Sequence, residues 1–271
     1  CFHGDEATLR ETQNAQIALF TVGLAAWAAL KPRLKDQDFR FAGHSLGEYC
    51  AVVASGALSI ESGARLVQKR GAIMAASGAT RPGTMAAILG LDRDKLETVC
   101  AGASTEDAVV VIANDNCPGQ LVISGDVAAV EAASKAALEA GAKRALPLNV
   151  SGAFHSPLMA DSAIEMGKAL RLTTWNEQNF AVYANVTGDA VEHGAEWANH
   201  LEAQLRSPVR WTEDVQAMRR DGVDTFIECG CGEALSGLIR RIDSGAKTFA
   251  VNDLATLEST AMALSEVEVN A

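Results

Sequence analysis

Ser45 stands in the segment GHSLG, residues 43–47, which follows a short apolar run and precedes an alanine-rich stretch with helical spacing. The pattern G-x-S-x-G between a strand and a helix is typical of a nucleophile elbow. We expect the flanking glycines because a tight turn leaves no room for Cβ atoms. The N–H of Leu46 would lie at the helix N-terminus, where it can stabilise an oxyanion. The alternative is a serine that only caps a helix, and the strand-turn-helix context favours the nucleophile.

A serine nucleophile needs a base, and the sequence contains five histidines. His155 falls in SGAFHSPLM, a loop of small residues between a predicted strand and a predicted helix, where a side chain can face a cleft between domains. The alternative is a histidine that only packs beside Phe154. The others begin the chain, adjoin the serine or lie in a polar stretch (His3, His44, His193, His200). His155 is therefore the candidate base.

Arg70 interrupts an apolar stripe on a predicted helix, because apolar residues lie three or four positions to either side of it (Leu66, Val67, Ile73, Met74). A guanidinium in that position must find an anion, since an unpaired buried charge is costly. An internal salt bridge and a ligand carboxylate held bidentately explain the residue equally well.

Two cysteine- and glycine-rich segments carry weaker signals. CGC at 229–231 has no second pair of cysteines or histidines at zinc spacing, so the sequence predicts no metal site. GCGEALSG at 230–237 lacks both the Walker lysine pattern and the G-x-G-x-x-G spacing. A turn between a strand and a helix is enough to explain it.

Composition narrows the protein class. The 271 residues are 48% apolar, which suffices for a buried core, and the six cysteines are scattered rather than spaced as a disulfide framework. This pattern favours a reducing compartment, and we expect a cytoplasmic protein. The apolar run at 17–30 has 14 residues and no basic leader before it, so we expect a buried helix rather than a membrane span.

The net charge of −11 would repel nucleic acid and anionic membranes, so neither is an expected partner. An anionic substrate or acidic protein would need a local basic patch. Three pairs of neighbouring basic residues could supply one, although solvated surface positions are the simpler interpretation (Lys69/Arg70, Arg219/Arg220, Arg240/Arg241).

Predicted helices and strands alternate along the chain. The periodicity predicts a helix over 12–30, a strand over 39–42, a helix over 46–55 and a helix from an N-cap at Ser59 to about residue 77. TRPGT at 80–84 breaks the pattern. Residues 84–150 then read as β-α-β-β-α-β, the ferredoxin-like arrangement, and form a predicted inserted domain.

After the insertion the sequence predicts a helix from Pro157, a strand over 180–186 and helices over 195–205 and 212–221. A strand over 224–229, a helix over 234–242, a strand over 247–251 and a helix from Leu254 follow. Such alternation indicates an α/β fold with a mostly parallel sheet. Residues 1–83 and 151–271 would form the main domain.

These segments together resemble the malonyl-CoA:acyl carrier protein transacylases and the related acyltransferase domains of fatty-acid and polyketide synthases. The matching segments run in order along nearly the whole chain: TQNAQIALF, GHSLGEYCAVVASGALS, LVQKRGAIM, GTMAAILGL, NDNCPGQLVISG, SGAFHSPLM, ANVTG, QLRSPVRW, ECGCGEALSGLIRR and VND. The combination of GHSLGEY with a downstream GAFHS is highly specific. The family fold is an α/β-hydrolase-like domain with a ferredoxin-like insertion, in agreement with the predicted element order.

The resemblance implies that Ser45 is acylated and that His155 is its base, oriented by a backbone carbonyl at Ser207 rather than by a carboxylate. It implies that Arg70 pairs with the malonyl carboxylate and that the AFHS loop favours malonyl over methylmalonyl groups. It also implies further residues that line the substrate cleft (Asn116, Gln120, His44, Met74, Phe154).

One family segment has no match here. Family members begin with a strand and a GQGSQ segment whose glutamine supplies a second oxyanion N–H, and these 271 residues contain no such segment. A protein that truly lacked it would lose one of two oxyanion donors, a change that typically costs about 10²–10³-fold in rate.

The resemblance implies malonyl transfer from malonyl-CoA to the phosphopantetheine thiol of acyl carrier protein, with no cofactor and as a monomer. Two alternatives remain. A serine esterase or thioesterase of α/β-hydrolase type would need a histidine near the C-terminus, but none follows His200. A non-catalytic module that only binds carrier protein is the other.

Overall fold

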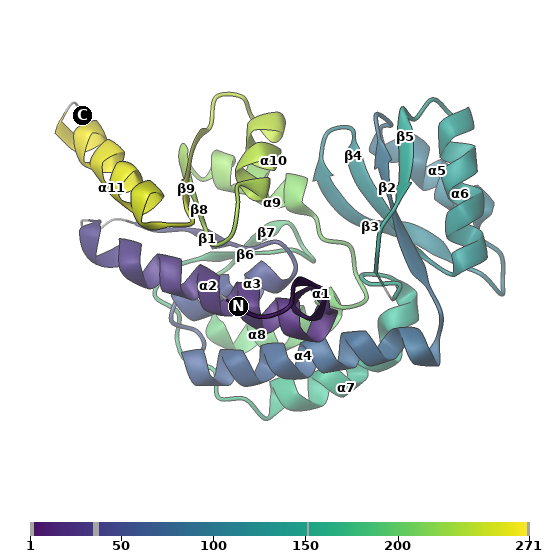
Figure 1. Cartoon of the computed structure of the whole chain (residues 1–271), viewed down its shortest axis with the longest axis horizontal. Coiled ribbons are helices and arrows are strands. Elements are labelled where there is room, and N and C mark those ends of the chain that lie inside the picture. Colours follow the sequence, from purple (N-terminus) through teal and green to yellow (C-terminus); the bar gives the residue numbers. More distant parts are fainter. Residues whose placement is uncertain (1–2, 35–37, 151, 270–271) are drawn as a thin grey trace.

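The structure is a computed structural model that describes residues 3–34, 38–150 and 152–269. In Figure 1 a larger unit of helices and short strands lies at the left and centre, and a smaller unit of four strands and two helices lies at the right. The chain passes from the larger to the smaller unit after helix α4 and returns after strand β5.

Two long helices, α2 (Thr12–Leu30) and α4 (Ile60–Thr80), pack against each other in the larger unit. The Ser59 side chain caps α4 by accepting the N–H of Ser62 at 3.2 Å, as predicted. Gly71 allows the close approach of the two helices, because a Cβ there would lie 2.9 Å from Cα of Gln13. Short helices α1 (Glu6–Arg10) and η1 (Lys31–Arg33) flank α2.

The strands of the larger unit form two short sheets. Strand β1 (Phe41–Ala42) pairs parallel with β6 (Val182–Ala184), which pairs antiparallel with β7 (Asp189–Val191). Strands β8 (Thr225–Cys229) and β9 (Lys247–Val251) pair parallel with each other. The expected α/β class is confirmed. Among the described strands of this unit two pairs are parallel and one is antiparallel, but they lie in two separate sheets rather than in the one sheet that was predicted.

A groove of about 850 Å³ is lined by residues of both sheets. Residues 38–44 line one side of it and residues 221–231 the other, and α2 contributes Gly23, Leu24 and Trp27. Among the described strands, none lies between β1 and β8. Each of these strands therefore has one edge without a strand partner in the described part of the chain.

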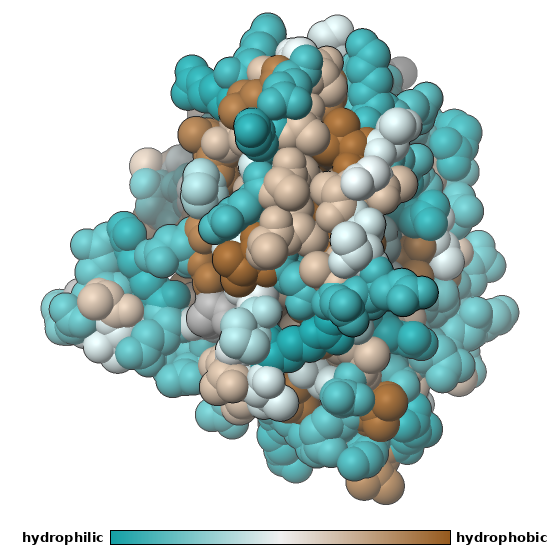
Figure 2. Space-filling model, turned by 90° about the vertical axis from the view of Figure 1, so that its right-hand side faces the viewer, coloured by the Kyte–Doolittle hydropathy of each residue, from teal (hydrophilic) through white to brown (hydrophobic). Residues whose placement is uncertain are grey.

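The smaller unit has the element order β2 (Thr84–Leu89), α5 (Arg93–Ala103), β3 (Val110–Cys117), β4 (Gln120–Gly125), α6 (Val127–Glu139) and β5 (Arg144–Pro147). Its sheet has the strand order β3-β4-β2-β5, and every neighbouring pair is antiparallel. Residues between 86 and 145 form a separate apolar cluster. Figure 2 looks at the molecule from this end, where hydrophilic side chains border a strip of more apolar ones.

The remaining helices surround the strands of the larger unit. They are η2 (Pro157–Met159), α7 (Ala160–Arg171), η3 (Gly194–Glu196), α8 (Trp197–Gln204), α9 (Trp211–Arg220), α10 (Ala234–Ile242) and α11 (Leu254–Val269). The predicted strand over 180–186 is shorter than expected, because the chain turns at Thr187 and Gly188 and returns as β7. Gly188 has a φ of +73°, which suits this turn.

Helix α2 is longer than its apolar run suggests and is only partly buried. The segment Thr12–Arg33 is long and apolar enough to cross a membrane by length and composition, with a mean hydropathy of 1.3. In the structure it packs on α3 and α4 with one face and borders the groove with another. The expected buried helix is therefore buried only in part, at five residues of α2 (Gln16, Phe20, Gly23, Leu24 and Leu30).

Candidate active site

Ser45 occupies the sharp turn between β1 and α3 (Leu46–Ala54). Its φ of 53° and ψ of −103° are strained for a residue with a Cβ. A Cβ on Gly43 would lie 1.9 Å from the backbone of Gly47, so the prediction of a turn without room is confirmed there. A Cβ on Gly47 would meet nothing within 4 Å, because this glycine borders the open groove. The side chain of Ser45 makes no helix-capping hydrogen bond.

His155 lies directly beside this serine. Its Nε2 is 2.8 Å from Oγ of Ser45, although 110 positions separate the two residues. The loop before η2 is docked on the C-terminal end of α8, because the N–H of His155 donates to the carbonyl of Leu205 at 3.1 Å. His155 has a φ of 58°, the second non-glycine residue with a left-handed backbone in the described chain. The two residues with strained backbones, Ser45 and His155, are therefore in contact at Oγ of Ser45.

The carbonyl that orients His155 is not the predicted one. Nδ1 of His155 donates to the backbone oxygen of Gln204 at 2.9 Å, and the Ser207 backbone makes a smaller contribution to the pKa of the imidazole. The reason is local: α8 ends at Gln204, where its last carbonyls have no intrahelical donor. A proton on Nδ1 leaves Nε2 as an acceptor for the Ser45 hydroxyl.

Burial, reinforced by the positive charge of Arg70, lowers the pKa of His155 to about 3. The imidazole is therefore neutral at neutral pH. A neutral imidazole can take a proton from the serine, which is the state that a general base needs.

Arg70 projects from α4 into the same place and is 1% exposed. Its NH2 donates to Oγ of Ser45 at 2.9 Å and to Oε1 of Gln204 at 3.0 Å, and NH1 donates to Oε1 of Gln16 at 2.6 Å. The guanidinium also lies 5.6 Å from the ring centre of Tyr49. These direct partners are all neutral, and Arg70 forms no salt bridge with the residues that the structure describes, so the alternative of an internal salt bridge is not supported there.

Three buried polar residues complete the site, and sequence reasoning missed them as site residues. Glu48, Asn185 and Gln204 are each 0% exposed. Asn185 Oδ1 accepts the N–H of Ser45 at 2.8 Å, and Gln204 Nε2 donates to the carbonyl of Ser45 at 2.9 Å. The sequence contained a signal for one of them. Glu48 lies in an otherwise apolar helix, so it could have been identified as a buried charge in the same way as Arg70.

The other predicted substrate residues are distributed around this centre. His44 Nε2 lies 2.8 Å from Oδ1 of Asn116, which brings the smaller unit against the serine turn. Gln120 instead accepts a hydrogen bond from Arg241 of α10 at 2.5 Å. Met74 accepts a bond from Gln16 Nε2 at 3.3 Å, and Phe154 is buried in the main core.

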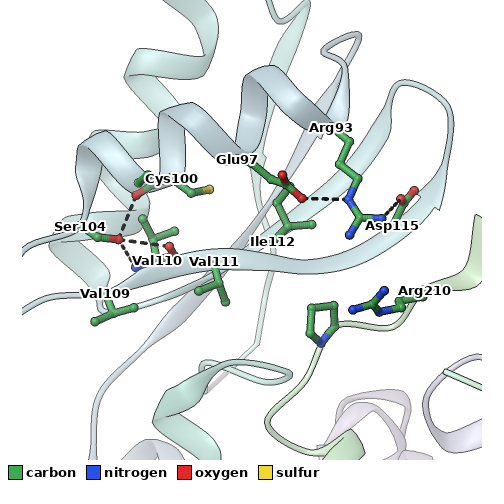
Figure 3. A pocket seen from close by; sticks show the side chains of 12 residues that line it. Arg93, Glu97, Cys100, Ser104, Val109, Val110, Val111, Ile112, Asp115 and Arg210 are labelled. Atoms are coloured by element: carbon green, nitrogen blue, oxygen red, sulfur yellow. Dashed lines mark hydrogen bonds and ion pairs between the residues drawn. The ribbon is translucent and has the colours of Figure 1, made fainter. Parts of the chain in front are cut away.

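A further contact joins the two units away from Ser45. Arg93 of α5 donates to Asp115 at 3.1 Å and to Glu213 of α9 at 2.6 Å. Figure 3 shows this arginine at one end of a cavity of about 410 Å³, which Arg210 and Pro208 border from the larger unit. Asp115 and Glu213 pair with Arg93, and Glu213 also pairs with Arg210 at 3.2 Å, so both arginines that line this cavity already have carboxylate partners.

The weaker sequence signals lead to no second site in the described residues. Those residues contain no group of three metal-ligating side chains, and their five cysteines are free. The sixth, Cys1, lies outside the described residues. The paired basic residues other than Arg70 have polar partners at the surface, such as Glu165 for Lys69 and Asp243 for Arg219.

Comparisons with known proteins point to one family. The family model described as acyl transferase domain matches residues 2–245. The chain is 43% identical over 270 residues to the malonyl CoA-acyl carrier protein transacylase of Bacillus subtilis (strain 168), covering 100% of this chain and 85% of that protein. It is 40% identical over 253 residues to the enzyme of the same name from Staphylococcus aureus (strain MSSA476), covering 93% of this chain and 81% of that one.

Solved structures resemble it equally well. The malonyl-CoA:acyl carrier protein transacylase of Xanthomonas oryzae pv. oryzae superposes with a TM-score of 0.92 at 39% identity, covering 96% of this chain and 83% of that one. A malonyl-transacylase in complex with its type II PKS acyl-carrier protein gives a TM-score of 0.92 at 35% identity, with coverage of 96% and 84%.

Proposed function

Because this chain belongs to the acyl transferase family, we propose that it transfers a malonyl group from malonyl-CoA to the phosphopantetheine thiol of acyl carrier protein. The observation that carries the proposal is the convergence of a base and a buried cation on Oγ of Ser45, at 2.8 and 2.9 Å. The base supports acyl transfer, and the cation supports an acyl group that bears its own carboxylate.

In the first half-reaction, Nε2 of His155 takes the hydroxyl proton of Ser45 while Oγ attacks the thioester carbonyl of malonyl-CoA. The tetrahedral oxyanion is stabilised by the N–H of Leu46, which as the first residue of α3 has no intrahelical acceptor. The carbon–sulfur bond then breaks, and the imidazolium returns its proton to the CoA sulfur. The product is malonyl-Ser45.

In the second half-reaction, the thiol of the carrier protein's phosphopantetheine gives its proton to His155 and attacks the malonyl ester. The same oxyanion donor serves, and the proton returns to Oγ of Ser45 as the carbon–oxygen bond breaks. The protein uses no cofactor of its own in this scheme. The pantetheine arm belongs to the partner.

Arg70 supplies the selectivity. The malonyl carboxylate lies one methylene from the reacting carbonyl, and the guanidinium lies at the nucleophile itself. An acetyl group has no carboxylate to pair with this buried charge, so it lacks the interaction that malonyl gains, which penalises the wrong substrate. A bound carboxylate would also offset the charge that lowers the pKa of His155, and the base would become stronger when malonyl is present.

For the architecture, we infer an α/β-hydrolase-like domain of residues 1–83 and 151–271 with a ferredoxin-like domain of residues 84–150 inserted. The antiparallel strand order β3-β4-β2-β5 and the separate apolar cluster support the inserted domain. We further infer a cytoplasmic monomer, with neither nucleic acid nor membrane as a partner.

The test is a transfer assay with malonyl-CoA and carrier protein in its holo and apo forms. We expect malonyl transfer to the holo form only, and much slower release of free malonate. Rapid malonate release without an acceptor would indicate an esterase. Binding of carrier protein with no acylation of either protein would indicate a docking module. Either result would overturn the proposed function.

A further inference from the structure

Glu48 is a buried carboxylate to which the reaction scheme gives no task. It lies on α3 one turn after Ser45 and is 0% exposed. Oε1 accepts the backbone N–H of Asn185 at 2.7 Å, and Oε2 accepts a hydrogen bond from Nε2 of Gln204. A buried carboxylate is costly unless its partners compensate for lost water. Its position therefore needs an explanation.

The partners of Glu48 are the two residues that hold the reacting groups. Asn185 accepts the N–H of Ser45 at 2.8 Å and donates to the carbonyl of Gly43 at 2.9 Å, so it fixes both sides of the strained turn. Gln204 holds three groups: the carbonyl of Ser45 at 2.9 Å, the guanidinium of Arg70 at 3.0 Å and Nδ1 of His155 at 2.9 Å.

The direction of the two hydrogen bonds to Glu48 requires a side chain at this position that only accepts. Asn185 offers a backbone N–H and Gln204 offers an amide N–H, and an ionised carboxylate accepts both. Gln204 cannot turn its amide around, because its Oε1 would then leave Arg70 and its NH2 would face a cation. A glutamine at position 48 would keep the bond from Asn185 but place a donor against the donor of Gln204.

We propose that Glu48 is a positioning residue for the acyl transfer: its carboxylate fixes Asn185 and Gln204, which together orient Ser45, His155 and Arg70. The inference rests on the proposed function and adds a residue to it. Glu48 touches neither substrate nor reacting atoms. It acts through the two residues that do touch the catalytic groups.

The charges around Glu48 predict a pH signature. Burial opposes the ionised form, whereas the hydrogen bonds from Asn185 and Gln204 and the charge of Arg70 on α4 favour it. On α9, burial and the charge of Glu48 raise the pKa of Asp214 well above its usual range, and Tyr49 and His155 beside Arg70 are neutral. Burial raises the pKa of Glu48 to about 7. A protonated Glu48 carries an O–H donor on one oxygen and accepts less strongly there, so acylation should slow as the pH falls through about 7. His155, with a pKa of about 3, does not titrate there.

The experiment measures single-turnover acylation of Ser45 by mass spectrometry over a range from about pH 5 to 8. Malonyl-pantetheine is the acyl donor, because the phosphate of CoA, which it lacks, titrates at about pH 6. We expect Glu48→Gln to slow acylation about 10- to 100-fold, as a small misplacement of catalytic groups does, and to abolish the limb near neutral pH. The matched control, Glu61→Gln, changes an exposed carboxylate and should behave as the parent does.

Two measurements keep the outcome decisive. If Glu48→Gln does not fold, as judged by its melting curve, the pH profile of the parent chain alone decides: a flat profile across this range contradicts the inference. If it folds, an unchanged rate and an unchanged limb contradict it. A parent chain that forms no adduct at any pH refutes the proposed function instead, so the two failures are distinguishable.

Discussion

His155, in the loop before η2, and Arg70, on α4, contact the same atom. Nε2 of the imidazole lies 2.8 Å and NH2 of the guanidinium 2.9 Å from Oγ of Ser45. The cation holds the imidazole neutral by adding to the effect of burial on its pKa. It also marks where a substrate carboxylate would bind. One buried charge thus acts on the base and the nucleophile, and in the proposed reaction it also selects the acyl group.

Replacing Arg70 should reverse the acyl preference. Arg70→Ala removes the partner of the malonyl carboxylate, so we expect the acylation rate with malonyl-CoA to fall about 100-fold, the range of a lost charge-assisted hydrogen bond. The rate with acetyl-CoA should fall less or rise. The measurement is the ratio of the two kcat/KM values.

Arg70→Lys is the control for charge alone. A lysine keeps the positive charge but cannot form the bidentate pair, so the malonyl preference should be only partly restored. An Arg70→Ala protein that keeps the parent's ratio of malonyl to acetyl rates would refute the role of Arg70 in selectivity.

His155 and Glu48 should affect stability with opposite pH dependence. The folded pKa of His155 is lowered to about 3 from 6.5, so between these values the unfolded chain binds the extra proton and the stabilising contribution grows as pH rises. The folded pKa of Glu48 is raised to about 7 from 4.5, so its contribution is present below the unfolded value and is lost as pH rises.

Between about pH 4.5 and 6.5 the pH dependences of the two contributions to the free energy of unfolding should therefore cancel in the parent. Relative to the parent, the destabilisation by His155→Ala should grow with pH in this window, and that by Glu48→Gln should shrink, each by about 1 kcal/mol per pH unit. Urea unfolding at several pH values measures both differences. Equal slopes for the two variants would contradict the assignments.

Gly71 should be intolerant of a methyl group. In most helices Gly→Ala stabilises by up to about 1 kcal/mol. Here the new Cβ would lie 2.9 Å from Cα of Gln13 on α2, so we expect a loss of about 1–3 kcal/mol in the free energy of unfolding. The Gly71→Ala variant should lose activity too, because Gln16 on the displaced helix accepts a hydrogen bond from NH1 of Arg70.

Gly237→Ala is the matched control, because a Cβ on this α10 residue would meet nothing within 4 Å. It should be neutral or stabilising. If both alanine variants melt at or above the parent's temperature, the close packing of α2 on α4 is not required.

The local features of the site could be predicted from the sequence, whereas its long-range pairing could not. G-x-S-x-G fixes the turn because Gly43 and Gly47 meet there, and the apolar stripe around Arg70 shows that a charge is buried. The structure places His155 at Ser45 as the sequence suggested. These are signals within a few residues of one another.

Other features depended on backbone paths that no short pattern reveals. Ser207 was expected to orient His155, but α8 ends at Gln204 and presents that carbonyl instead. Asn185 follows a strand that was predicted too long, so its contact with Ser45 was not apparent. The prediction of a single sheet was wrong for the same reason. Whether β1 and β8 belong to one sheet depends on the order of the strands in space, which no short sequence pattern reveals.

The most direct test of the central claim is peptide mass spectrometry of the parent chain after brief incubation with malonyl-CoA and acid quench. We predict a malonyl ester on the peptide that contains Ser45, absent in Ser45→Ala and much reduced in His155→Ala, with His193→Ala, an exposed histidine, equal to the parent. A malonyl group on another residue, or an adduct on Ser45 that forms equally fast without His155, would contradict the account.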